Sequence, residues 1–339
     1  MLRVAAFTGG RDVPSARFRI RQYIAELVEL GISIHEYSRF YGSYPPRQRW
    51  LRPFWAVATL LESLPHCLIS HKYDLVILQR ELISKYFTIE PLTGSPRVLD
   101  VDDAIFMYRG GASARKLACL ADLIICGNNF LADWFNTWNK NVAIIPTAVD
   151  TNRYFPAVRK RSEINSKVIG WIGTSTNLRY VYSIEKALKK VMDLYPNVRL
   201  RFVCNQRPSF HWLDKSRVDF LKWTAVDEVT SIQGMDIGIM PLADSLWEQG
   251  KCSYKMLQYM SCALPVVVSP VGMNADLLSM GNLGIGAKTE NDWIDGLVTL
   301  LNNDDLCCRM GSSGRQIVNT TFSIRALAPK LASCLKRLC

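Results

Sequence analysis

Two lysines and a glutamine in the second half of the sequence have the types and spacing of an anion-binding site. Lys251, Lys255 and Gln258 lie at positions i, i+4 and i+7, so they share one face of a helix predicted to begin near Gly250 and to end before Pro265. Cations in a first turn oppose the helix dipole, and they become favourable there when they bind a strong anion together with the free backbone N–H groups. The alternative is a solvated face of polar side chains.

A second loop carries residues suited to the same anion. The apolar strand of residues 168–173 ends at Gly173, whose missing side chain lets a ligand approach the backbone. Arg179 lies in the first turn of the helix predicted to follow. Between strand and helix stand three hydroxyl residues, which either cap the helix or bind phosphate oxygens: Thr174, Ser175 and Thr176. Because both loops follow strand carboxyl ends of one domain, we expect them to converge on one anion.

Gly9 and Gly10 follow the first predicted strand, and arginines crowd the loop and the helix that come next. They are Arg11, Arg17, Arg19 and Arg21. These side chains either hold donor phosphates or an acidic acceptor, or form a solvated basic face of the next helix.

Three carboxylates stand at the end of another predicted strand, within RVLDVDDAIF at 97–106: Asp100, Asp102 and Asp103. Such a cluster either binds a divalent cation or pairs with nearby arginines. A haloacid-dehalogenase phosphatase would need Thr or Val where Ala104 stands, and its motif would lie on the N-terminal strand. The sequence therefore favours pairing with arginine or orientation of a substrate, and we predict no metal site.

Short apolar runs alternate with helix-length amphipathic segments along nearly the whole chain. This order favours parallel sheets joined by right-handed crossovers. Runs such as LRVAAFT and VIGWIG barely alternate in polarity, as is typical of strands covered on both faces. The polar, basic segment 151–166 separates two groups of strands. The predicted fold is α/β, with two Rossmann-like, doubly wound parallel-sheet domains at residues 1–155 and 165–320.

Composition narrows the class of protein. The 339 residues are 49% apolar and 21% charged, which excludes a disordered chain. The formal net charge of +11 predicts an anionic partner. No run reaches the roughly 20 apolar residues of a membrane span. The N-terminus lacks the pattern of a signal peptide, and ten cysteines without one indicate a reducing, cytoplasmic location.

Five strings in succession resemble the GT-B glycosyltransferases of the group 1, or family 4, type. They are GG after the first strand, ADLIICGNNFLADWF, VAIIPTAVDTNRYFP, VIGWIGTSTNLRYV and MPLADSLWEQGKCSYKMLQYMSCALPVVVSPVG. An S-x-R-F-R string near the N-terminus and a D-x-D-D strand end are similar to one subgroup. The resemblance covers residues 3–335. It implies a GT-B fold whose two domains face each other across a cleft, with the segment 321–339 crossing back to the first domain.

The resemblance also implies an activity. It predicts a nucleotide-sugar-dependent hexosyltransferase that retains the anomeric configuration and needs neither a cofactor nor an obligatory metal. The donor, of the UDP or GDP type, would bind mainly to the second domain, and a saccharide or lipid-linked saccharide acceptor to the first.

Two motif positions depart from the commoner pattern of this family. Where members usually carry a Glu, seven residues and a second Glu, this chain has Gly250 and Gln258, with Glu248 two residues before Gly250. Where the family often has arginine after the strand-end glycine, Thr174 stands. We hypothesise that Lys251 and Lys255 supply the charge that Thr174 lacks, and that Gln258 binds the ribose.

These considerations assign roles to residues of both domains. Arg179 and Lys251 are the predicted catalytic residues, because cations placed around the β-phosphate stabilise the charge that develops there as the diphosphate leaves. The predicted donor-binding residues are Gly10, Gly173, Thr174, Ser175, Thr176, Glu248, Lys255 and Gln258. The predicted acceptor-side residues are Arg11, Arg17, Arg19, Asp102 and Asp103.

Residues 45–67 place arginines beside aromatic side chains ahead of an apolar helix. Such a segment suits the headgroup region of an anionic bilayer, and a core helix with a basic N-terminal loop is the alternative. The membrane interpretation predicts a lipid-linked acceptor in surface polysaccharide or glycan synthesis. It also predicts a peripheral position on the cytoplasmic face of the membrane.

Two other classes of function stay open. A nucleotide-sugar epimerase or hydrolase of GT-B fold would need a water-activating carboxylate or histidine, for which His35 is the best placed histidine. A basic nucleic-acid-binding protein would need a recognition motif, whereas the arginines and lysines here are dispersed, so no nucleic-acid partner is expected.

Overall fold

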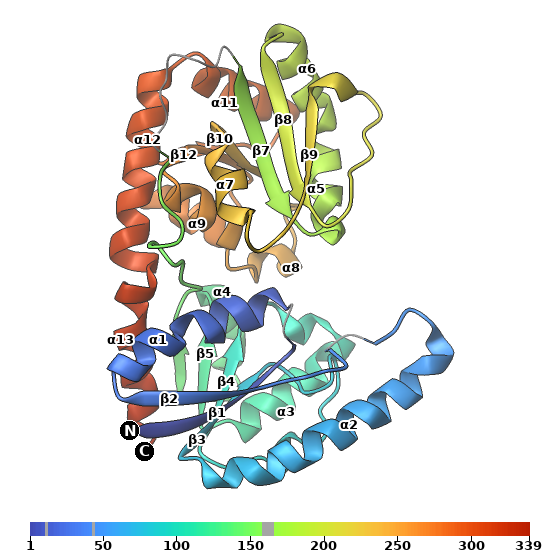
Figure 1. The fold of residues 1–339 in the computed structure, drawn as a ribbon, viewed down its shortest axis with the longest axis vertical. Coiled ribbons are helices and arrows are strands. Elements are labelled where there is room, and N and C mark those ends of the chain that lie inside the picture. The colour runs from blue at the N-terminus through green and yellow to red at the C-terminus, as the bar shows by residue number, and fades with distance from the viewer. Residues whose placement is uncertain (11–12, 43–44, 158–165) are drawn as a thin grey trace. The chain divides into compact units, whose positions relative to one another are not determined.

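The computed structural model describes residues 1–10, 13–42, 45–157 and 166–339. Arg11 therefore lies outside the described residues. The chain divides into two compact units, called the first and the second unit below (Figure 1). The first unit consists of Met1–Ala148, Gly250–Cys252 and Ile324–Cys339, and the second of Val149–Gln249 and Ser253–Ser323.

The first unit is built on a six-stranded sheet in the order β2-β1-β3-β4-β5-β6, and each neighbouring pair of strands is parallel. Its strands are β1 (Leu2–Thr8), β2 (Ile32–Ser38), β3 (Leu75–Gln79), β4 (Arg97–Val101), β5 (Leu123–Cys126) and β6 (Val142–Ile144). β3 and most of β4 are buried, as expected for a parallel strand covered on both faces.

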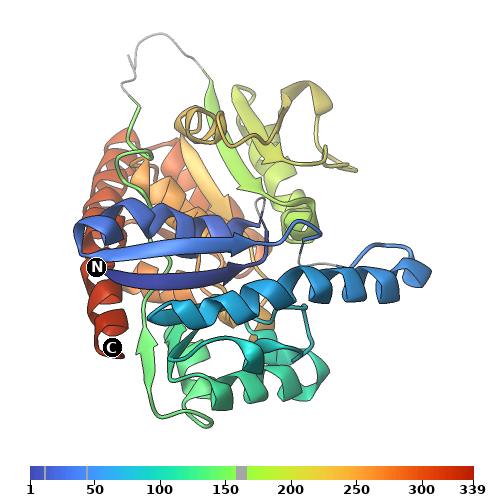
Figure 2. The ribbon, with the colours of Figure 1, turned by 60° about the horizontal axis from the view of Figure 1, so that its bottom comes forward.

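Helices cover both faces of this sheet. They are α1 (Ile24–Glu29), α2 (Arg52–Ile69), α3 (Ala112–Leu120), α4 (Asn129–Phe135) and α13 (Ile324–Lys336). Apolar residues of α1 and α13 form one core with alternate residues of the central strands. Figure 2 shows α1 and α2 on opposite sides of β1 and β2. The last helix of the chain thus belongs to the core of the first unit.

The second unit has a six-stranded sheet in the order β12-β11-β10-β7-β8-β9, and its neighbouring pairs are also parallel. Its strands are β7 (Lys167–Gly173), β8 (Val198–Cys204), β9 (Val218–Lys222), β10 (Ile237–Met240), β11 (Val266–Val268) and β12 (Gly284–Gly286). Its helices are α5 (Leu178–Ser183), α6 (Glu185–Leu194), α7 (Glu228–Gln233), α8 (Leu246–Gln249), α9 (Tyr254–Ser261), α10 (Met273–Ser279), α11 (Glu290–Leu301) and α12 (Asp304–Ile317).

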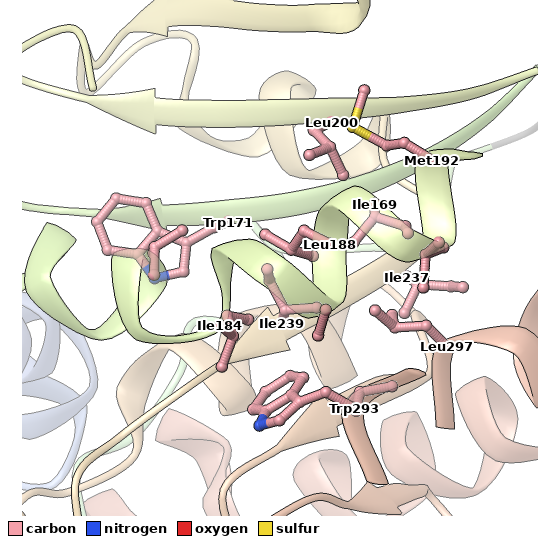
Figure 3. Packing of buried hydrophobic residues seen from close by; sticks show 14 of the residues in the cluster. Ile169, Trp171, Ile184, Leu188, Met192, Leu200, Ile237, Ile239, Trp293 and Leu297 are labelled. Carbon is pink, nitrogen blue, oxygen red and sulfur yellow. The ribbon is translucent and has the colours of Figure 1, made fainter. Parts of the chain in front are cut away.

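The core of the second unit lies between this sheet and the helices α6 and α11. Figure 3 shows Trp171 of β7 and Trp293 of α11 in it, together with aliphatic residues of β8, β10 and α6. Both tryptophans are fully buried, at 1% and 2% exposure. The apolar residues of the predicted strands therefore form this core. The prediction of a doubly wound, all-parallel α/β fold is confirmed.

One predicted helix boundary is wrong. The helix that carries Lys255 and Gln258 begins at Tyr254 rather than near Gly250, and Lys251 lies in the segment that precedes it. Ser253 has a left-handed backbone (φ 48°), which ends the turn before the helix. A side chain at Gly250 would lie 2.7 Å from the Ala104 Cβ, so this backbone packs tightly within the first unit. Lys251 therefore does not share a helix face with Lys255.

A tyrosine separates the two central strands of the second sheet. β7 and β10 pair only at Ile169 with Ile237 and at Gly170 with Gly238. Beyond that point the Tyr259 hydroxyl lies between them, accepting from the Ile172 N–H at 2.9 Å and donating to the Ile239 carbonyl at 3.3 Å. Glycine is required at 238, because a Cβ there would lie 2.5 Å from the Tyr259 ring. The strands thus part at their carboxyl ends, and the Tyr259 hydroxyl replaces the partner that the Ile172 N–H and the Ile239 carbonyl would have on the neighbouring strand.

Removing this hydroxyl should weaken the second unit. We expect Tyr259→Phe to lower the free energy of unfolding by about 1–3 kcal/mol, because a buried N–H and a buried C=O lose their partner. Urea unfolding measures the change, and amide hydrogen exchange at Ile172 should become faster. Tyr182→Phe is the matched control, since Tyr182 is 37% exposed and should cost less than about 0.5 kcal/mol. Equal losses in both variants would contradict this account.

Candidate functional site

The strand order of the second sheet locates its binding edge. The chain winds outward in one direction from β7 to β9 and in the other from β10 to β12, so the order reverses between β7 and β10. Ligands of open parallel sheets bind outside the carboxyl ends of the strands at such a reversal. The loops after Gly173 and Met240 leave the sheet at this point, where Tyr259 parts the strands.

The end of β7 is shaped by a contact between Gly173 and Lys255. A Cβ at Gly173 would lie 2.6 Å from the Trp171 ring and 2.8 Å from Lys255 Cε, so only glycine fits. The Lys255 ammonium lies 6.0 Å from the centroid of the Trp171 ring. The structure therefore brings together the strand-end glycine and one of the two predicted lysines. Their binding of a donor stays a prediction.

The hydroxyl loop after Gly173 is organised by its own hydrogen bonds. The hydroxyls of Thr174 and Thr176 lie 2.9 Å apart, and Asn177 Nδ2 donates to Thr174 Oγ1 at 3.0 Å. Asn205, which follows β8, accepts from the Ser175 N–H at 2.8 Å and donates to its hydroxyl at 3.2 Å. The loop is thereby held in place while its polar atoms stay at the surface.

Arg179 is anchored by a buried carboxylate. Its Nη2 donates to the Tyr180 hydroxyl at 2.6 Å and lies 3.4 Å from Glu248 Oε1. The Tyr180 hydroxyl donates to Glu248 Oε1, and the Ser245 hydroxyl to Glu248 Oε2. The side chain of Glu248 is only 3% exposed, whereas that of Arg179 is 66% exposed. Glu248 thus fixes a cation that reaches solvent at the strand reversal.

This arrangement changes proton affinities. Burial and the hydrogen bond to Glu248 raise the pKa of Tyr180 to about 12. The hydrogen bond to Tyr180 and its charge interaction raise the pKa of Arg179, so the guanidinium stays protonated. Tyr180 and Ser245 were not among the predicted site residues. The sequence offers no local signal for Tyr180, because its partner Glu248 is 68 residues away. Ser245 lies three residues before Glu248, a spacing at which such a contact could have been considered.

Gln258 is engaged inside the second unit. Its Nε2 donates to the Tyr154 hydroxyl at 3.0 Å and to Glu228 Oε1 at 3.2 Å, and the residue is 3% exposed. The Tyr154 hydroxyl itself donates to Glu228 Oε2 at 2.6 Å. The ribose-binding role of Gln258 stays a prediction. To bind a ribose, its amide N–H groups would have to donate to the sugar in addition to Tyr154 and the buried Glu228.

Lys251, the second predicted catalytic residue, belongs to the first unit, whereas Arg179 belongs to the second. The Lys251 carbonyl accepts from Asn128 Nδ2 at 3.2 Å. Burial raises the pKa of Asp103, and the charges of Arg80 and Lys251 oppose this rise. Lys251 therefore lies near the carboxyl end of β4, among the charges of the predicted acceptor side.

The aspartates after β4 pair with arginine. Arg80 Nε donates to Asp102 Oδ1 at 2.8 Å, and Arg80 Nη2 donates to Asp103 Oδ2 at 2.6 Å. This is the pairing that the sequence offered as the alternative to a metal. Among the described residues, no group of three His, Cys, Asp or Glu side chains is arranged to hold a metal ion.

Arg19 serves the interior of the first unit. Its Nε and Nη2 donate to the Asp100 carboxylate, with a shortest distance of 2.6 Å, and its Nη1 donates to the Ile145 carbonyl at 2.6 Å. Burial alone would lower the pKa of the Arg19 guanidinium. The charge and hydrogen bonds of the Asp100 carboxylate outweigh this effect and raise the pKa above its ordinary value, so Arg19 keeps its charge. At 4% exposure Arg19 positions neighbouring elements, and its acceptor contact stays a prediction.

Two other predicted residues of the first unit are Gly10, which follows β1, and Arg17, which lies in the π-helical segment Ala16–Ile20. The Gly10 carbonyl accepts from Arg21 Nη2 at 2.8 Å, and its φ of 134° favours glycine at this position. The Arg17 guanidinium lies 4.5 Å from the centroid of the Phe18 ring. Neither contact by itself tests the predicted roles of Gly10 and Arg17.

Solved structures with the same architecture identify the fold. A sucrose-phosphate synthase from Thermosynechococcus elongatus matches with a TM-score of 0.73 at 14% identity, covering 100% of this chain and 99% of that one. The Anabaena protein Alr3699/HepE, in complex with UDP-glucose, matches with a TM-score of 0.71 at 14% identity over 100% of both chains. The fold is GT-B. At these identities the likeness concerns the fold alone.

Sequence comparisons connect the second unit of this GT-B chain with a family. Residues 166–303 match the model of the family described as glycosyl transferases group 1. A D-inositol 3-phosphate glycosyltransferase from Corynebacterium urealyticum is 22% identical over 197 residues, which are 50% of this chain and 45% of that protein. The match therefore spans less than half of the relative. The matched family segment contains the strand reversal, Arg179, Glu248 and Lys255.

The Glu248 carboxylate should control the titration of Tyr180. We expect Glu248→Gln to lower the pKa of Tyr180 from about 12 toward its ordinary value near 10, because the phenolate then forms without a neighbouring negative charge. Tyrosine-labelled NMR over a pH series measures it, with Tyr180→Phe assigning the signal.

The same shift predicts how stability depends on pH. Because the pKa of Tyr180 is raised on folding, its contribution is fully present below pH about 10 and is lost as pH rises toward about 12. This alkaline loss should shrink in Glu248→Gln. A Tyr180 pKa that stays unchanged in this variant would contradict the described contact.

Proposed function

We propose that this chain is a nucleotide-sugar-dependent hexosyltransferase whose second unit binds the donor. One observation carries the proposal: the segment that matches the group 1 glycosyltransferases also contains the strand reversal with Gly173, Arg179 and Lys255. Two cations and a glycine at strand carboxyl ends suit a diphosphate. The likeness to a protein complexed with UDP-glucose supports a donor of the UDP type, with GDP sugars as the other class.

The proposed mechanism is electrostatic. When the bond between the anomeric carbon and the diphosphate breaks, its electron pair stays on the phosphate oxygen and the sugar becomes oxocarbenium-like. An exposed guanidinium held by Glu248 and Tyr180 is preorganised for this charge, since it needs no reorientation during the reaction. Lys255 beside Gly173 supports it from α9, and Lys251 is assigned the same role. The acceptor hydroxyl oxygen then bonds to the anomeric carbon with retention of configuration, and its proton passes to the departing diphosphate.

We assign the acceptor to the first unit. The charged groups Asp102, Asp103 and Lys251 near the carboxyl end of β4, and Arg17 in the segment after β1, can hydrogen-bond saccharide hydroxyls or a phosphate. A saccharide or lipid-linked saccharide of surface polysaccharide or glycan synthesis is the proposed acceptor. The chain would then work in the cytoplasm or as a peripheral protein on the cytoplasmic face of a membrane. No helix of the described segments has both the length and the apolar character needed to cross a bilayer.

Removing either predicted catalytic cation should slow transfer. We expect Arg179→Ala and Lys251→Ala each to reduce kcat by about 10²–10³-fold, because each takes away a charge that stabilises the leaving diphosphate. A thermal-shift panel of UDP- and GDP-sugars first identifies the donor, and steady-state transfer then measures the rates. Arg199→Ala is the control, since Arg199 pairs with Asp219 on the neighbouring strand at 2.5 Å.

The outcomes separate the candidate functions. Wild-type rates in both variants would remove the catalytic assignment. Consumption of the nucleotide sugar without any acceptor would favour an epimerase or hydrolase. Salt-dependent DNA retardation without stabilisation by any nucleotide sugar would favour a nucleic-acid-binding protein. The anomeric configuration of the product, measured by NMR, tests retention.

Transfer should not need a divalent metal. Asp102 and Asp103 both pair with Arg80, and the proposed diphosphate site relies on side-chain cations. We therefore expect kcat to change by less than about twofold after exhaustive treatment with EDTA, with Arg179→Ala measured alongside to show that the assay detects a real loss. Loss of activity in EDTA that Mg²⁺ or Mn²⁺ restores would overturn this part of the proposal.

A further inference from the structure

The helix α2 carries its large apolar side chains on the outside. Six of them follow each other at alternating intervals of four and three residues and are 36–70% exposed: Trp50, Phe54, Val57, Leu61, Leu64 and Leu68. We call these residues the α2 stripe. The intervals place them along one side of the helix and of the turn before it. With 18 residues in α2, the stripe is about 27 Å long.

The inward side of α2 consists of small residues. Thr59, Ser63 and Cys67 are 0–4% exposed, and the Ser70 hydroxyl at the end of the helix accepts from the Gly94 N–H at 2.8 Å. A helix that only covered a sheet would turn its leucines inward. Within the first unit, Figures 1 and 2 show no described element over the outer side of α2. An exposed apolar surface of this length marks an interaction site.

Charge decides between a lipid surface and a second copy of the chain. Arg47, Arg49 and Arg52 are exposed at the start of α2, and Lys72 is exposed just beyond its end. Glu62 is the one acidic residue between positions 45 and 72, and its Oε1 accepts from the Phe40 N–H at 2.7 Å. Two copies paired along α2 would therefore set positive ends against positive ends in either direction, whereas an anionic bilayer compensates them.

We propose that the α2 stripe inserts into the surface of an anionic lipid bilayer, with α2 lying in the plane of the membrane. Trp50 and Phe54 suit the interface between headgroups and acyl chains, and the three arginines reach lipid phosphates. This inference rests on the proposed function for its purpose, which is to bring the first unit to a lipid-linked acceptor. The association itself requires no donor and no catalysis.

Flotation of the full chain with vesicles tests the insertion. The wild type should float with phosphatidylcholine vesicles that contain phosphatidylglycerol, less with phosphatidylcholine alone, and less at high salt. Phe54→Ser with Leu61→Ser should lower the partition coefficient at least about tenfold, since each side chain loses apolar burial. Arg47→Gln with Arg49→Gln should lower it about tenfold or more on anionic vesicles only.

Controls separate insertion from other effects. Val226→Ser changes an apolar residue of the second unit that is 86% exposed, and it should leave flotation unchanged. Thermal unfolding confirms that the variants fold, and light scattering gives the number of copies. Absence of wild-type flotation at low salt would overturn the proposal. The proposal would also be overturned if the double variant Phe54→Ser/Leu61→Ser converted a dimer to a monomer while its flotation stayed the same.

The donor measurement keeps the two proposals distinguishable. Stabilisation by a UDP- or GDP-sugar should be equal in the wild type and in the α2 variants, because the donor is assigned to the second unit. Flotation without donor binding would refute the proposed function and support the membrane surface. Donor binding without flotation would refute the membrane surface and support the proposed function.

Discussion

The candidate donor site depends on a single hydroxyl group placed between two strands. Parallel strands must hydrogen-bond to each other or leave buried N–H and C=O groups unpaired, and unpaired groups are costly. Tyr259 lets β7 and β10 separate early, because its hydroxyl accepts from the Ile172 N–H and donates to the Ile239 carbonyl. The loops that follow can then diverge, and the residues between them gain access to the edge of the sheet.

A second constraint concerns how positive charge is held at this edge. Arg179 and Lys255 both come from the beginnings of helices, where the dipole disfavours cations. Glu248 compensates for this near Arg179, since its buried carboxylate is bound by Tyr180 and Ser245 and lies 3.4 Å from the guanidinium. Lys255 rests instead on the aromatic face of Trp171, beside a glycine that leaves room for it. Each cation is thus positioned before any ligand arrives.

The fold could be predicted from the sequence because its information is local. Continuous apolar runs such as 168–173 and 75–78 fall within β7 and β3, since strands covered on both faces need no polar positions. β12 escaped prediction because Gly284–Gly286 is three residues long and two of them are glycine. The helix predicted after the first strand is divided into a π-helical segment (Ala16–Ile20), a 3-10 segment (Arg21–Tyr23) and α1, which periodicity does not distinguish from one helix.

The contacts of the site could be predicted only in part. Gly173 and the cations stand out by residue type, but hydrogen-bond partners far apart in sequence, such as Ser175 with Asn205, have no local pattern. The start of α9 was misplaced because the left-handed conformation of Ser253 depends on its surroundings. Likewise, the spacing of apolar residues in α2 predicts a helix but not which side of it faces the sheet. The small residues Thr59, Ser63 and Cys67 form the buried side, because they allow close packing.

The amide of Gln258 has a consequence for how such chains can diverge. It donates to a buried glutamate, Glu228, which already binds the hydroxyl of Tyr154 and the indole of Trp223. A carboxylate at position 258 would face another carboxylate at the same short separation, in surroundings that water does not reach, and one of them would have to take up a proton. In a related chain with glutamate at position 258, we therefore expect either a residue without negative charge at position 228 or a protonated carboxyl at one of the two positions.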